Sequence, residues 1–244
     1  MRHTWERTAL LVGEEAVAEM AQKSVAIFGV GGVGAYAAEA IARSGVGRIL
    51  LYDSDTVSPT NINRQLIALH STIGQRKVDV MAARILDINP ECVVETYYLH
   101  IGRETRSEIS LEGCDYVVDA VDMVAAKLII IEEAVNRGIP VVSAMGAGNK
   151  LDAHRFEVVP IRRTKYDPLS RVMRKELRRR GIHDIKVVYS PDPPLRPRKI
   201  VMASKKIVPG SVSYVPATMG MLIAGEVIKD LMAAGPLESI ENRE

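Results

Sequence analysis

The sequence predicts an α/β fold in which a Rossmann-like, mostly parallel sheet is flanked by helices. From Ser24 onward, short β-branched runs alternate with segments of helical period, which is typical of strand-helix-strand units. The first run leads into a glycine-rich turn at 29–34, and the alternation ends near residue 151, where a basic, proline-rich crossover segment is inserted. The 244 residues suit one large domain carrying an insertion.

The first elements form one strand-helix-strand unit. Residues 24–28 are almost continuously apolar, as expected of a strand buried on both faces. A helix of small residues, Ala35–Arg43, can lie close to the sheet, and Arg48–Tyr52 is the second strand. Apolar residues at helical spacing then predict a helix over 78–86, which Pro90 prevents from continuing.

The later elements repeat this alternation. We predict strands at 93–99, 116–118 and 139–144, a helix at 125–137, and a C-terminal helix at about 215–233 with Pro216 near its start. The chain is therefore interpreted as one domain over residues 1–244. Its core lies at about 20–150 and its basic insertion at about 151–210.

Positive charge is concentrated in the insertion. Residues 151–210 hold 16 of the 32 Lys and Arg residues but 6 of the 30 Asp and Glu residues, a local balance of +10 that leaves −8 for the rest of the chain. Such asymmetry favours an acidic body with one basic element. By itself, a basic element of this kind is most simply a solvated helix face.

The composition excludes several classes of protein. Two cysteines, Cys92 and Cys114, cannot build a disulfide framework or a four-thiolate zinc site, so we expect no zinc and a reducing, cytoplasmic setting. The N-terminus lacks the apolar core of a signal peptide. No run approaches the roughly 20 apolar residues of a membrane-spanning helix, so we expect no membrane association.

The glycine-rich turn predicts a nucleotide site. Gly29, Gly31 and Gly34 satisfy G-x-G-x-x-G, and Asp53 follows 19 residues after Gly34, at the end of the second strand. Backbone amides at the start of the next helix favour an anion, and a carboxylate at the position of Asp53 can bind ribose hydroxyls. The alternative is a turn whose glycines only permit tight packing.

The segment after the second strand favours ATP over NAD. The glycine turn already serves the two phosphates of a dinucleotide, which has little use for the further cations Arg64 and Lys77. A triphosphate has such a use, because cations stabilise the charge that develops when an α-phosphorus is attacked and pyrophosphate leaves. A carboxylate such as Asp122 can hold the accompanying Mg²⁺. Taken singly, either cation is as well explained as a surface charge.

Together these motifs resemble the adenylation core of the ubiquitin-activating-enzyme-like superfamily, which includes the MoeB and ThiF enzymes of molybdopterin and thiamine sulfur chemistry. The resemblance spans roughly residues 5–150 and resumes over 205–232. Its motifs are Gly29-Val-Gly-Gly-Val-Gly34, Asp53-x-Asp55-x-Val57, Asn61-x-x-Arg64-Gln65, Lys77 and Asp115-Tyr-Val-Val-Asp119-Ala-Val-Asp122.

The resemblance implies a role for each matched residue. Asp53 would bind the ribose, Asn61, Arg64 and Lys77 would face the phosphates, and Asp122 would bind Mg²⁺. The residues expected to bind the nucleotide are Gly29, Gly31, Gly32, Gly34, Asp53, Asp55, Asn61, Arg64, Gln65 and Lys77. The residues expected to act in catalysis are Arg7, Arg64, Lys77 and Asp122.

The resemblance also implies a homodimer. Arg7 would reach into the nucleotide site of the partner subunit, carried by a segment, Trp5–Met20, whose apolar residues we expect to form a helical surface that needs a partner. One position departs from the family pattern. Met123 stands where the family usually has Asn after its magnesium-binding Asp, so any contribution of that side chain is lost.

The placement of cysteine narrows the choice within the superfamily. Members that pass activated carboxylates onward commonly carry a Cys after the fifth strand, whereas no Cys follows residue 141 here. The chain more closely resembles the tRNA threonylcarbamoyladenosine dehydratase branch. The additional motifs are Asp87-Ile-Asn89-Pro90-Glu91-Cys92, Asp167-Pro168-Leu169, Val188-Tyr189-Ser190 and Pro216-Ala-Thr-Met-Gly-Met221.

That branch implies a reaction on tRNA bearing threonylcarbamoyladenosine in its anticodon loop. ATP would adenylate the threonyl carboxylate and lose pyrophosphate, and attack from within the same modification would close a ring and release AMP. Intramolecular closure benefits from a large effective molarity, so no nucleophile of the enzyme is required. The expected cofactors are ATP and Mg²⁺; a monovalent cation and a sulfur-relay protein partner are left open.

The basic insertion then gains a second interpretation, as a surface that binds tRNA phosphates with little sequence reading. The residues expected to contact tRNA are Arg162, Arg163, Arg174, Lys175, Arg178, Arg179 and Arg180. Lys165, Tyr166 and Arg171 lie in the same stretch.

Three alternatives stay open at this point. The chain could adenylate the C-terminal glycine of a small ubiquitin-like sulfur carrier, although the missing cysteines and the basic insertion disfavour this. It could be an NAD(P)-dependent oxidoreductase, which only the glycine turn and Asp53 favour. A non-catalytic nucleotide-binding module would leave Arg64, Lys77 and Asp122 without a chemical task.

Overall fold

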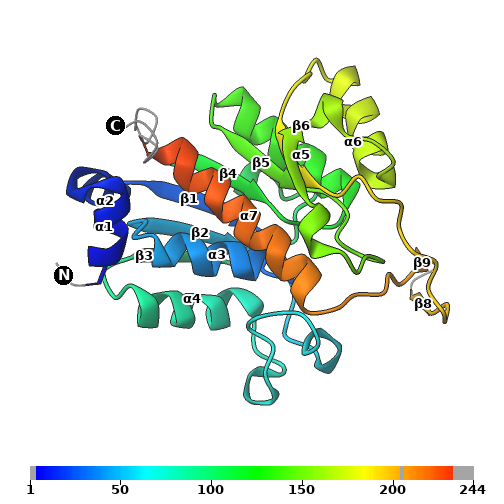
Figure 1. Cartoon of the computed structure of the whole chain (residues 1–244), viewed down its shortest axis with the longest axis horizontal. Coiled ribbons are helices and arrows are strands. Elements are labelled where there is room, and N and C mark those ends of the chain that lie inside the picture. Colours follow the sequence, from blue (N-terminus) through cyan, green and yellow to red (C-terminus); the bar gives the residue numbers. More distant parts are fainter. Residues whose placement is uncertain (1–3, 204–205, 233–244) are drawn as a thin grey trace, which may run out of the picture.

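The computed structural model describes residues 4–203 and 206–232, and its centre is a seven-stranded sheet of order β3-β2-β1-β4-β5-β7-β6 (Figure 1). Neighbouring strands pair in parallel except β6, which runs antiparallel to β7. The predicted α/β fold with a mostly parallel sheet is confirmed. The strands are β1 (Ser24–Phe28), β2 (Arg48–Tyr52), β3 (Val93–Tyr97), β4 (Tyr116–Asp119), β5 (Val141–Ala144), β6 (Glu157–Pro160) and β7 (Lys186–Tyr189).

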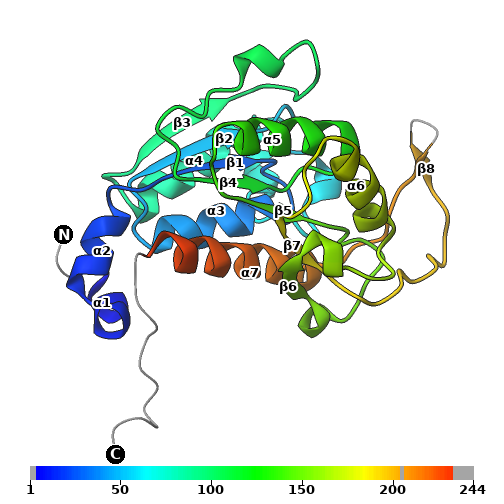
Figure 2. The ribbon, with the colours of Figure 1, turned by 90° about the horizontal axis from the view of Figure 1, so that it is seen from above.

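Helices cover both faces of the sheet (Figure 2). One face is covered by α3 (Gly34–Arg43), α4 (Lys77–Ile88) and α7 (Tyr214–Leu231), and the other by α5 (Val124–Asn136) and α6 (Pro168–Arg179). Strand β1 accordingly serves two cores: Val25 and Ile27 pack under α3 and α7, while Ala26 and Phe28 belong to the core under α5. This explains why β1 is apolar without alternation.

The C-terminal helix is the closest neighbour of α3. A Cβ atom on Gly220 would lie 2.4 Å from the carbonyl oxygen of Val33 and 2.9 Å from Cβ of Tyr36, so only glycine lets α7 approach α3 this closely. The helix begins one residue before its predicted start. The last residue of the prediction, Ala233, lies outside the described residues.

The basic segment contributes to the main sheet, which the sequence did not reveal. Strands β6 and β7 and helix α6 continue the alternation beyond residue 151, so the expectation that it ends there is wrong. Each of these strands has only four residues, and β6 lies at the sheet edge and ends in Pro160, which hides the pattern. A small hairpin, β8 (Met202–Ala203) and β9 (Lys206–Ile207), follows; Ser204 and Lys205 lie outside the described residues.

The N-terminal segment forms two short helices rather than one surface. Gly13, with φ of 89°, separates α1 (Glu6–Val12) from α2 (Glu14–Met20). Met20 is part of the main core, whereas Leu10 and Leu11 are 85% and 71% exposed, so the expected apolar surface is divided: one end packs on its own domain and the other stays uncovered.

Five short 3₁₀ helices complete the described elements, namely η1 (Pro59–Asn61), η2 (His70–Thr72), η3 (Arg106–Glu108), η4 (Ala153–Arg155) and η5 (Ile161–Arg163). Across residues 4–203 and 206–232, no helix has both the length and the apolar character to cross a bilayer.

Candidate active site

Two glycines of the turn between β1 and α3 are required by the protein itself. Gly29 has φ of 87°, and a Cβ atom there would lie 2.8 Å from the carbonyl oxygen of Ala120. On Gly34 a Cβ atom would lie 1.7 Å from the carbonyl oxygen of Gly29. A larger residue at Gly29 would force the turn away from the end of β4, and one at Gly34 would force the turn itself open.

The two middle glycines have a different environment. A Cβ atom on Gly31 would meet nothing closer than Nε2 of Gln65 at 3.7 Å, and one on Gly32 would lie 3.4 Å from Cβ of Pro216. These are ordinary or nearly ordinary contacts, so packing does not demand glycine at Gly31. Absence of a side chain there instead leaves the backbone open to a ligand.

The start of α3 presents unused backbone donors. Its N-cap residue, Val33, supplies no side-chain hydrogen bond, and the N–H groups of residues 31–34 find no acceptor among the described residues. Unsatisfied N–H groups together with the helix dipole favour an anion at this position.

Asp53 links the end of β2 to the glycine turn. Its Oδ2 accepts the N–H of Val30 at 2.7 Å, and its Oδ1 accepts the N–H of Asp55 at 2.8 Å. Burial raises the pKa of the Asp53 carboxyl, against the opposing charge of Lys77 and the two backbone hydrogen bonds. The carboxylate is thus fixed in orientation beside the turn, where the sequence predicts a ribose.

Lys77 is a buried cation at the first position of α4. It is 4% exposed, and its Nζ lies 2.7 Å from Oδ2 of Asp55, while its own N–H donates to the carbonyl oxygen of Asp55 at 3.1 Å. Asp55 therefore holds the ammonium group in place through both backbone and side chain. A buried lysine so held has little entropy left to lose when it meets a phosphate.

The segment between β2 and α4 places two more predicted residues next to the turn. The stem of Arg64 passes Gly32, with Cγ 3.5 Å from the position of a Cβ atom there, and its Nη1 donates to the carbonyl oxygen of Thr60 at 2.9 Å. Asn61 caps η1, because its Oδ1 accepts the N–H of Ser58 at 3.0 Å. Only its NH₂ group is thus left for a phosphate.

Gln65 holds an acceptor without a partner. The residue is buried, and its Oε1 has no hydrogen-bond partner in the structure. Buried polar atoms are nearly always satisfied, so an exception indicates a missing ligand or water. Since Nε2 of Gln65 lies near Gly31, the unsatisfied group adjoins the glycine turn.

Asp122 lies exposed in the loop that follows β4. Its carboxylate makes no hydrogen bond or ion pair with any residue that the structure describes. Ala120 lies two residues before Asp122, and its carbonyl oxygen is 2.8 Å from the position of a Cβ atom on Gly29 of the turn. A free carboxylate on a loop pressed against the glycine turn fits the requirement for Mg²⁺, which takes one or two carboxylates besides phosphate oxygens.

Arg7 lies far from the glycine turn of its own chain. Trp5, next to α1, donates its indole N–H to the carbonyl oxygen of Arg43, the last residue of α3, at 2.8 Å. The turn is at the other end of α3, about 15 Å away for ten residues. Figure 1 likewise shows α1 and α2 at the end of the sheet opposite the β8–β9 hairpin. Within one chain, Arg7 and the nucleotide site are therefore not brought together.

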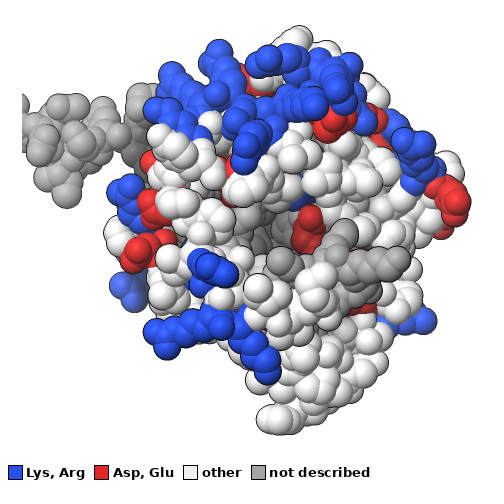
Figure 3. Space-filling view, turned by 90° about the vertical axis from the view of Figure 1, so that its right-hand side faces the viewer, with Lys and Arg blue, Asp and Glu red and all other residues white. Residues whose placement is uncertain are grey.

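Lys and Arg side chains gather over α6 (Figure 3). Four of the predicted tRNA residues already have partners: Arg162 pairs with Asp184, Arg179 with Glu176, Arg180 with Glu132 and Glu176, and Arg174 donates to Thr164. A hollow of about 400 Å³ lies on the helix. Its lining consists of Arg171, Arg174, Lys175, Arg178 and Arg179.

Three cations in that hollow form no ion pair among the described residues, namely Arg171, Lys175 and Arg178, although a hydrogen bond from Arg180 and the charge of Lys175 both help to lower the pKa of the neighbouring Glu176 carboxyl. Such a cluster of unpaired like charges is unfavourable in isolation and is stabilised by a polyanion.

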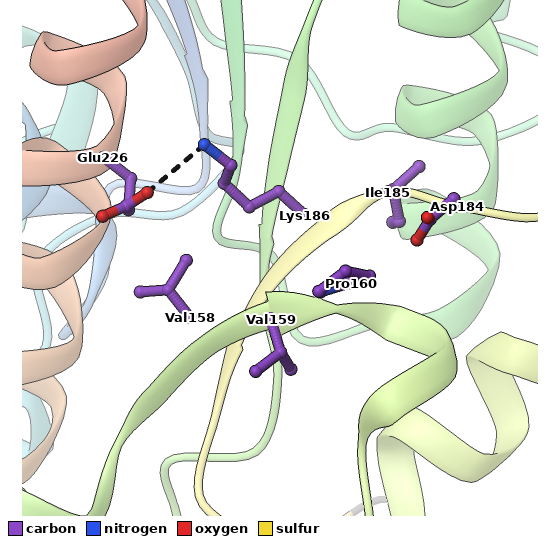
Figure 4. Close-up of a pocket in the computed structure, with 7 residues that line it drawn as sticks. All are labelled: Val158, Val159, Pro160, Asp184, Ile185, Lys186 and Glu226. Atoms are coloured by element: carbon purple, nitrogen blue, oxygen red, sulfur yellow. Dashed lines mark hydrogen bonds and ion pairs between the residues drawn. The ribbon is translucent and has the colours of Figure 1, made fainter. Parts of the chain in front are cut away.

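A second hollow, of about 360 Å³, lies between β6, β7 and α7 (Figure 4). It carries no glycine turn, and its cation, Lys186, is already paired with Glu226 and Asp230. It therefore lacks the free donors that a nucleotide needs.

The comparisons with known proteins agree with this geometry. A model of the ThiF family matches residues 5–243. The chain belongs to the ThiF family. It is 41% identical to the tRNA threonylcarbamoyladenosine dehydratase of Bacillus subtilis, with 100% of both chains covered, and 33% identical to that of Escherichia coli, with 95% of this chain and 94% of the relative covered.

Two solved structures that the chain resembles hold a nucleotide. The E. coli dehydratase TcdA in complex with AMP is 34% identical, with a TM-score of 0.87 and 95% of each chain covered. The same protein in complex with ATP is also 34% identical, with a TM-score of 0.86 and the same coverage. The predicted resemblance to this branch of the superfamily is confirmed.

One charged group next to the site was not singled out from the sequence. Lys127 lies in α5 and is fully buried. The available signal was a single lysine within the otherwise apolar run Val124-Ala-Ala-Lys-Leu-Ile-Ile-Ile131, a pattern in which a cation requires a buried partner.

Proposed function

We propose that the chain is an ATP-dependent tRNA threonylcarbamoyladenosine dehydratase. The observation that carries this proposal is the open donor site at the start of α3 beside Asp53, in a chain 41% identical over its whole length to the B. subtilis dehydratase. The threonyl carboxylate of the modified adenosine takes AMP from ATP, and pyrophosphate leaves. Attack from within the modification then closes a ring and releases AMP.

Different residues around the glycine turn bind different parts of ATP. Asp53 accepts the ribose hydroxyls, and the N–H groups at the start of α3 face the phosphates. Arg64 and Lys77 stabilise the charge on the departing pyrophosphate, and Asp55 keeps Lys77 in position. Asn61 and Gln65 contribute their remaining amide groups.

Asp122 is the proposed ligand of the Mg²⁺ that accompanies ATP. When bound there, the ion would supply positive charge that offsets the charge of the phosphates. Asp122 fits this role because its carboxylate is exposed and unpaired among the described residues, on a loop that touches the glycine turn. Met123, which follows it, is 37% exposed and offers no oxygen ligand.

The two cysteines support a reaction without a covalent enzyme intermediate. Burial raises the pKa of the Cys92 thiol to about 11, and burial also raises the pKa of Cys114. Neither is therefore a thiolate at neutral pH, and only the thiolate is a strong nucleophile. Ring closure within the substrate needs no such group.

The unpaired cations on α6 are the proposed tRNA contact. Arg171, Lys175 and Arg178 line one hollow and form no ion pair among residues 4–203 and 206–232. Phosphate contacts of this kind bind RNA without reading its sequence, which suits an enzyme that recognises a modification. Arg163 is exposed nearby and joins this surface.

We also propose a homodimer in which Arg7 completes the partner's site. Arg7 is exposed and lies at the far end of its own sheet, and Leu10 and Leu11 beside it are left uncovered. Mixing inactive Arg7→Ala with inactive Asp122→Asn protein under subunit exchange should restore part of the activity. Demonstrated exchange without recovered activity would rule out the shared site.

The proposed enzyme is cytoplasmic, and its whole chain forms a single adenylation domain.

The direct test is AMP formation with three candidate substrates. We expect AMP and pyrophosphate to form from ATP with tRNA bearing threonylcarbamoyladenosine, and not with the same tRNA lacking the modification. A small carrier protein ending in glycine is the third substrate. Turnover with that carrier and none with the modified tRNA would establish the sulfur-carrier alternative instead.

A further inference from the structure

An ion pair is completely buried beside the candidate site. Lys127 and Asp119 are each 0% exposed, and Nζ of Lys127 lies 3.1 Å from Oδ2 of Asp119. Nζ also donates to the carbonyl oxygen of Ala144 at 2.6 Å, and the hydroxyl of Ser143 donates to the same Asp119 oxygen at 2.5 Å. Because removing two charges from water costs about as much as their attraction returns, stability alone is a weak reason for such a pair.

The second oxygen of Asp119 holds the loop that carries Asp122. Oδ1 of Asp119 accepts the N–H of Val121 at 3.3 Å. Between them, Ala120 donates its N–H to the carbonyl oxygen of Phe28 at 2.8 Å, at the end of β1. Loop 120–122 is thus fastened to β1 and to the Asp119 side chain, immediately before Asp122.

Lys127 fastens the same loop from its other end. The backbone N–H of Lys127 donates to the carbonyl oxygen of Met123 at 2.9 Å, in the first turn of α5. The Lys127 side chain reaches back to the carboxyl ends of β4, at Asp119, and of β5, at Ala144. One ammonium group therefore joins β4 and α5, the two elements that bracket the loop, to β5.

We propose that the Lys127–Asp119 pair positions loop 120–122 against the glycine turn and so places Asp122. Lys127 is a positioning residue, since a side chain that is 0% exposed cannot touch a nucleotide. The consequence for the reaction rests on the role of Asp122 in the proposed function, whereas the effect on the loop does not.

Two double variants separate positioning from mere packing. Both Lys127→Met/Asp119→Asn and Lys127→Met/Asp119→Leu remove the two buried charges together, which avoids leaving one unpaired. Asn keeps an oxygen that can accept the Val121 N–H, and Leu does not. Hydrogen exchange of the Val121 amide in the free protein measures the loop without any activity.

Exchange of the Val121 amide should be faster than in the wild type in both variants, because both lack the pair, and at least about tenfold faster in the Leu variant than in the Asn variant, with the β4 amides equally protected in both. The Mg²⁺ concentration that half-saturates AMP formation should rise in the same order. Equal Val121 exchange in two folded variants would overturn the proposal. Faster exchange with an unchanged Mg²⁺ requirement would leave the positioning intact and contradict the role of Asp122.

If the Leu variant does not fold, Ser143→Ala replaces it. This change removes one hydrogen bond to Asp119 and alters little volume. Val121 exchange should then rise by a smaller factor in an otherwise stable protein. Exchange identical to that of the wild type would overturn the proposal.

Discussion

Lys77 and Asp53 beside the glycine turn are held in place, whereas three cations on α6 face solvent and form no ion pair among the described residues. Lys77 is fixed by Asp55, and Asp53 by two backbone N–H groups. Arg171, Lys175 and Arg178 share one hollow, and none of them makes a salt bridge with a described carboxylate.

The two regions therefore suit two kinds of ligand. A small nucleotide undergoing reaction requires groups already in place before it binds, since reorganisation costs free energy in the transition state. A large polyanion is bound by many mobile charges, each of which contributes through release of counterions. Fixed charge at one surface and free charge at the other are what an enzyme acting with ATP on tRNA needs.

The largest expected effect comes from comparing a glycine that the fold requires with a glycine that leaves space for the ligand. Gly34→Ala would place Cβ 1.7 Å from the carbonyl oxygen of Gly29, so we expect a loss of more than about 4 kcal/mol in the free energy of unfolding or no soluble protein. Gly31→Ala meets nothing closer than 3.7 Å and should fold normally while binding ATP more weakly. Thermal unfolding and ATP titration measure both; normal ATP affinity in Gly31→Ala would break the distinction.

The second-largest expected effect distinguishes Lys77, which acts on charge that develops in the transition state, from Asp53, which contacts ATP throughout the reaction. Lys77→Ala should lower turnover by about 10²–10³-fold, since it faces charge that develops on pyrophosphate. Asp53→Ala should mainly weaken ATP binding, because a ribose contact persists through the reaction. Single-turnover AMP formation and equilibrium ATP binding separate them. Unchanged ATP affinity with reduced turnover in Asp53→Ala would contradict the ribose assignment.

Much of the nucleotide region could be predicted from the sequence, because its geometry is encoded locally. The glycine spacing fixes the turn, and Asp53 follows at the end of β2, which lies next to β1 in a parallel sheet. Position 122 is likewise set by the end of β4. Helix and strand boundaries here differ from those expected by one or two residues.

The basic region was less predictable, because pairing depends on distant residues. Arg180 pairs with Glu132 on α5 as well as with Glu176 of its own helix, and Arg162 pairs with Asp184; the charge run itself does not reveal the pairs with Glu132 and Asp184. Lys127 escaped notice for the same reason, since its partners come from β4 and β5.

The distinction between paired and unpaired cations predicts a moderate effect on tRNA binding. Replacing Arg171, Lys175 and Arg178 with Ala should weaken all tRNAs alike and reduce the slope of log affinity against log salt by about one unit per lost phosphate contact. The matched control removes the same charge from paired positions outside the hollow, Arg155, Arg162 and Arg180. Equal slopes for the two triple variants would show that α6 is a solvated helix face and not a tRNA contact.

The smallest effect concerns a paired charge away from the ligand. Burial alone would raise the pKa of Glu39, but hydrogen bonds from Arg84 and Arg43 outweigh it, and the pKa is lowered from its ordinary value of 4.5. A lowered carboxyl pKa stabilises the fold above about pH 4.5, and this contribution is lost as the pH falls through the folded-state value.

Glu39→Gln should therefore be less stable than the wild type at pH 7, and the difference in free energy of unfolding should shrink as the pH falls below 4.5. Urea unfolding of both proteins across this range measures it. A difference that stays constant with pH would show that the pairing of Glu39 with α4 contributes nothing through its charge.

The most direct measurement is the mass of the modified nucleoside after reaction. Purified protein, ATP, Mg²⁺ and tRNA bearing threonylcarbamoyladenosine are incubated, and the tRNA is digested to nucleosides. We predict that the modified nucleoside loses one molecule of water, that one AMP forms for each, and that Cys92→Ser/Cys114→Ser protein does the same. A nucleoside of unchanged mass despite bound ATP and bound tRNA would contradict the proposed dehydratase.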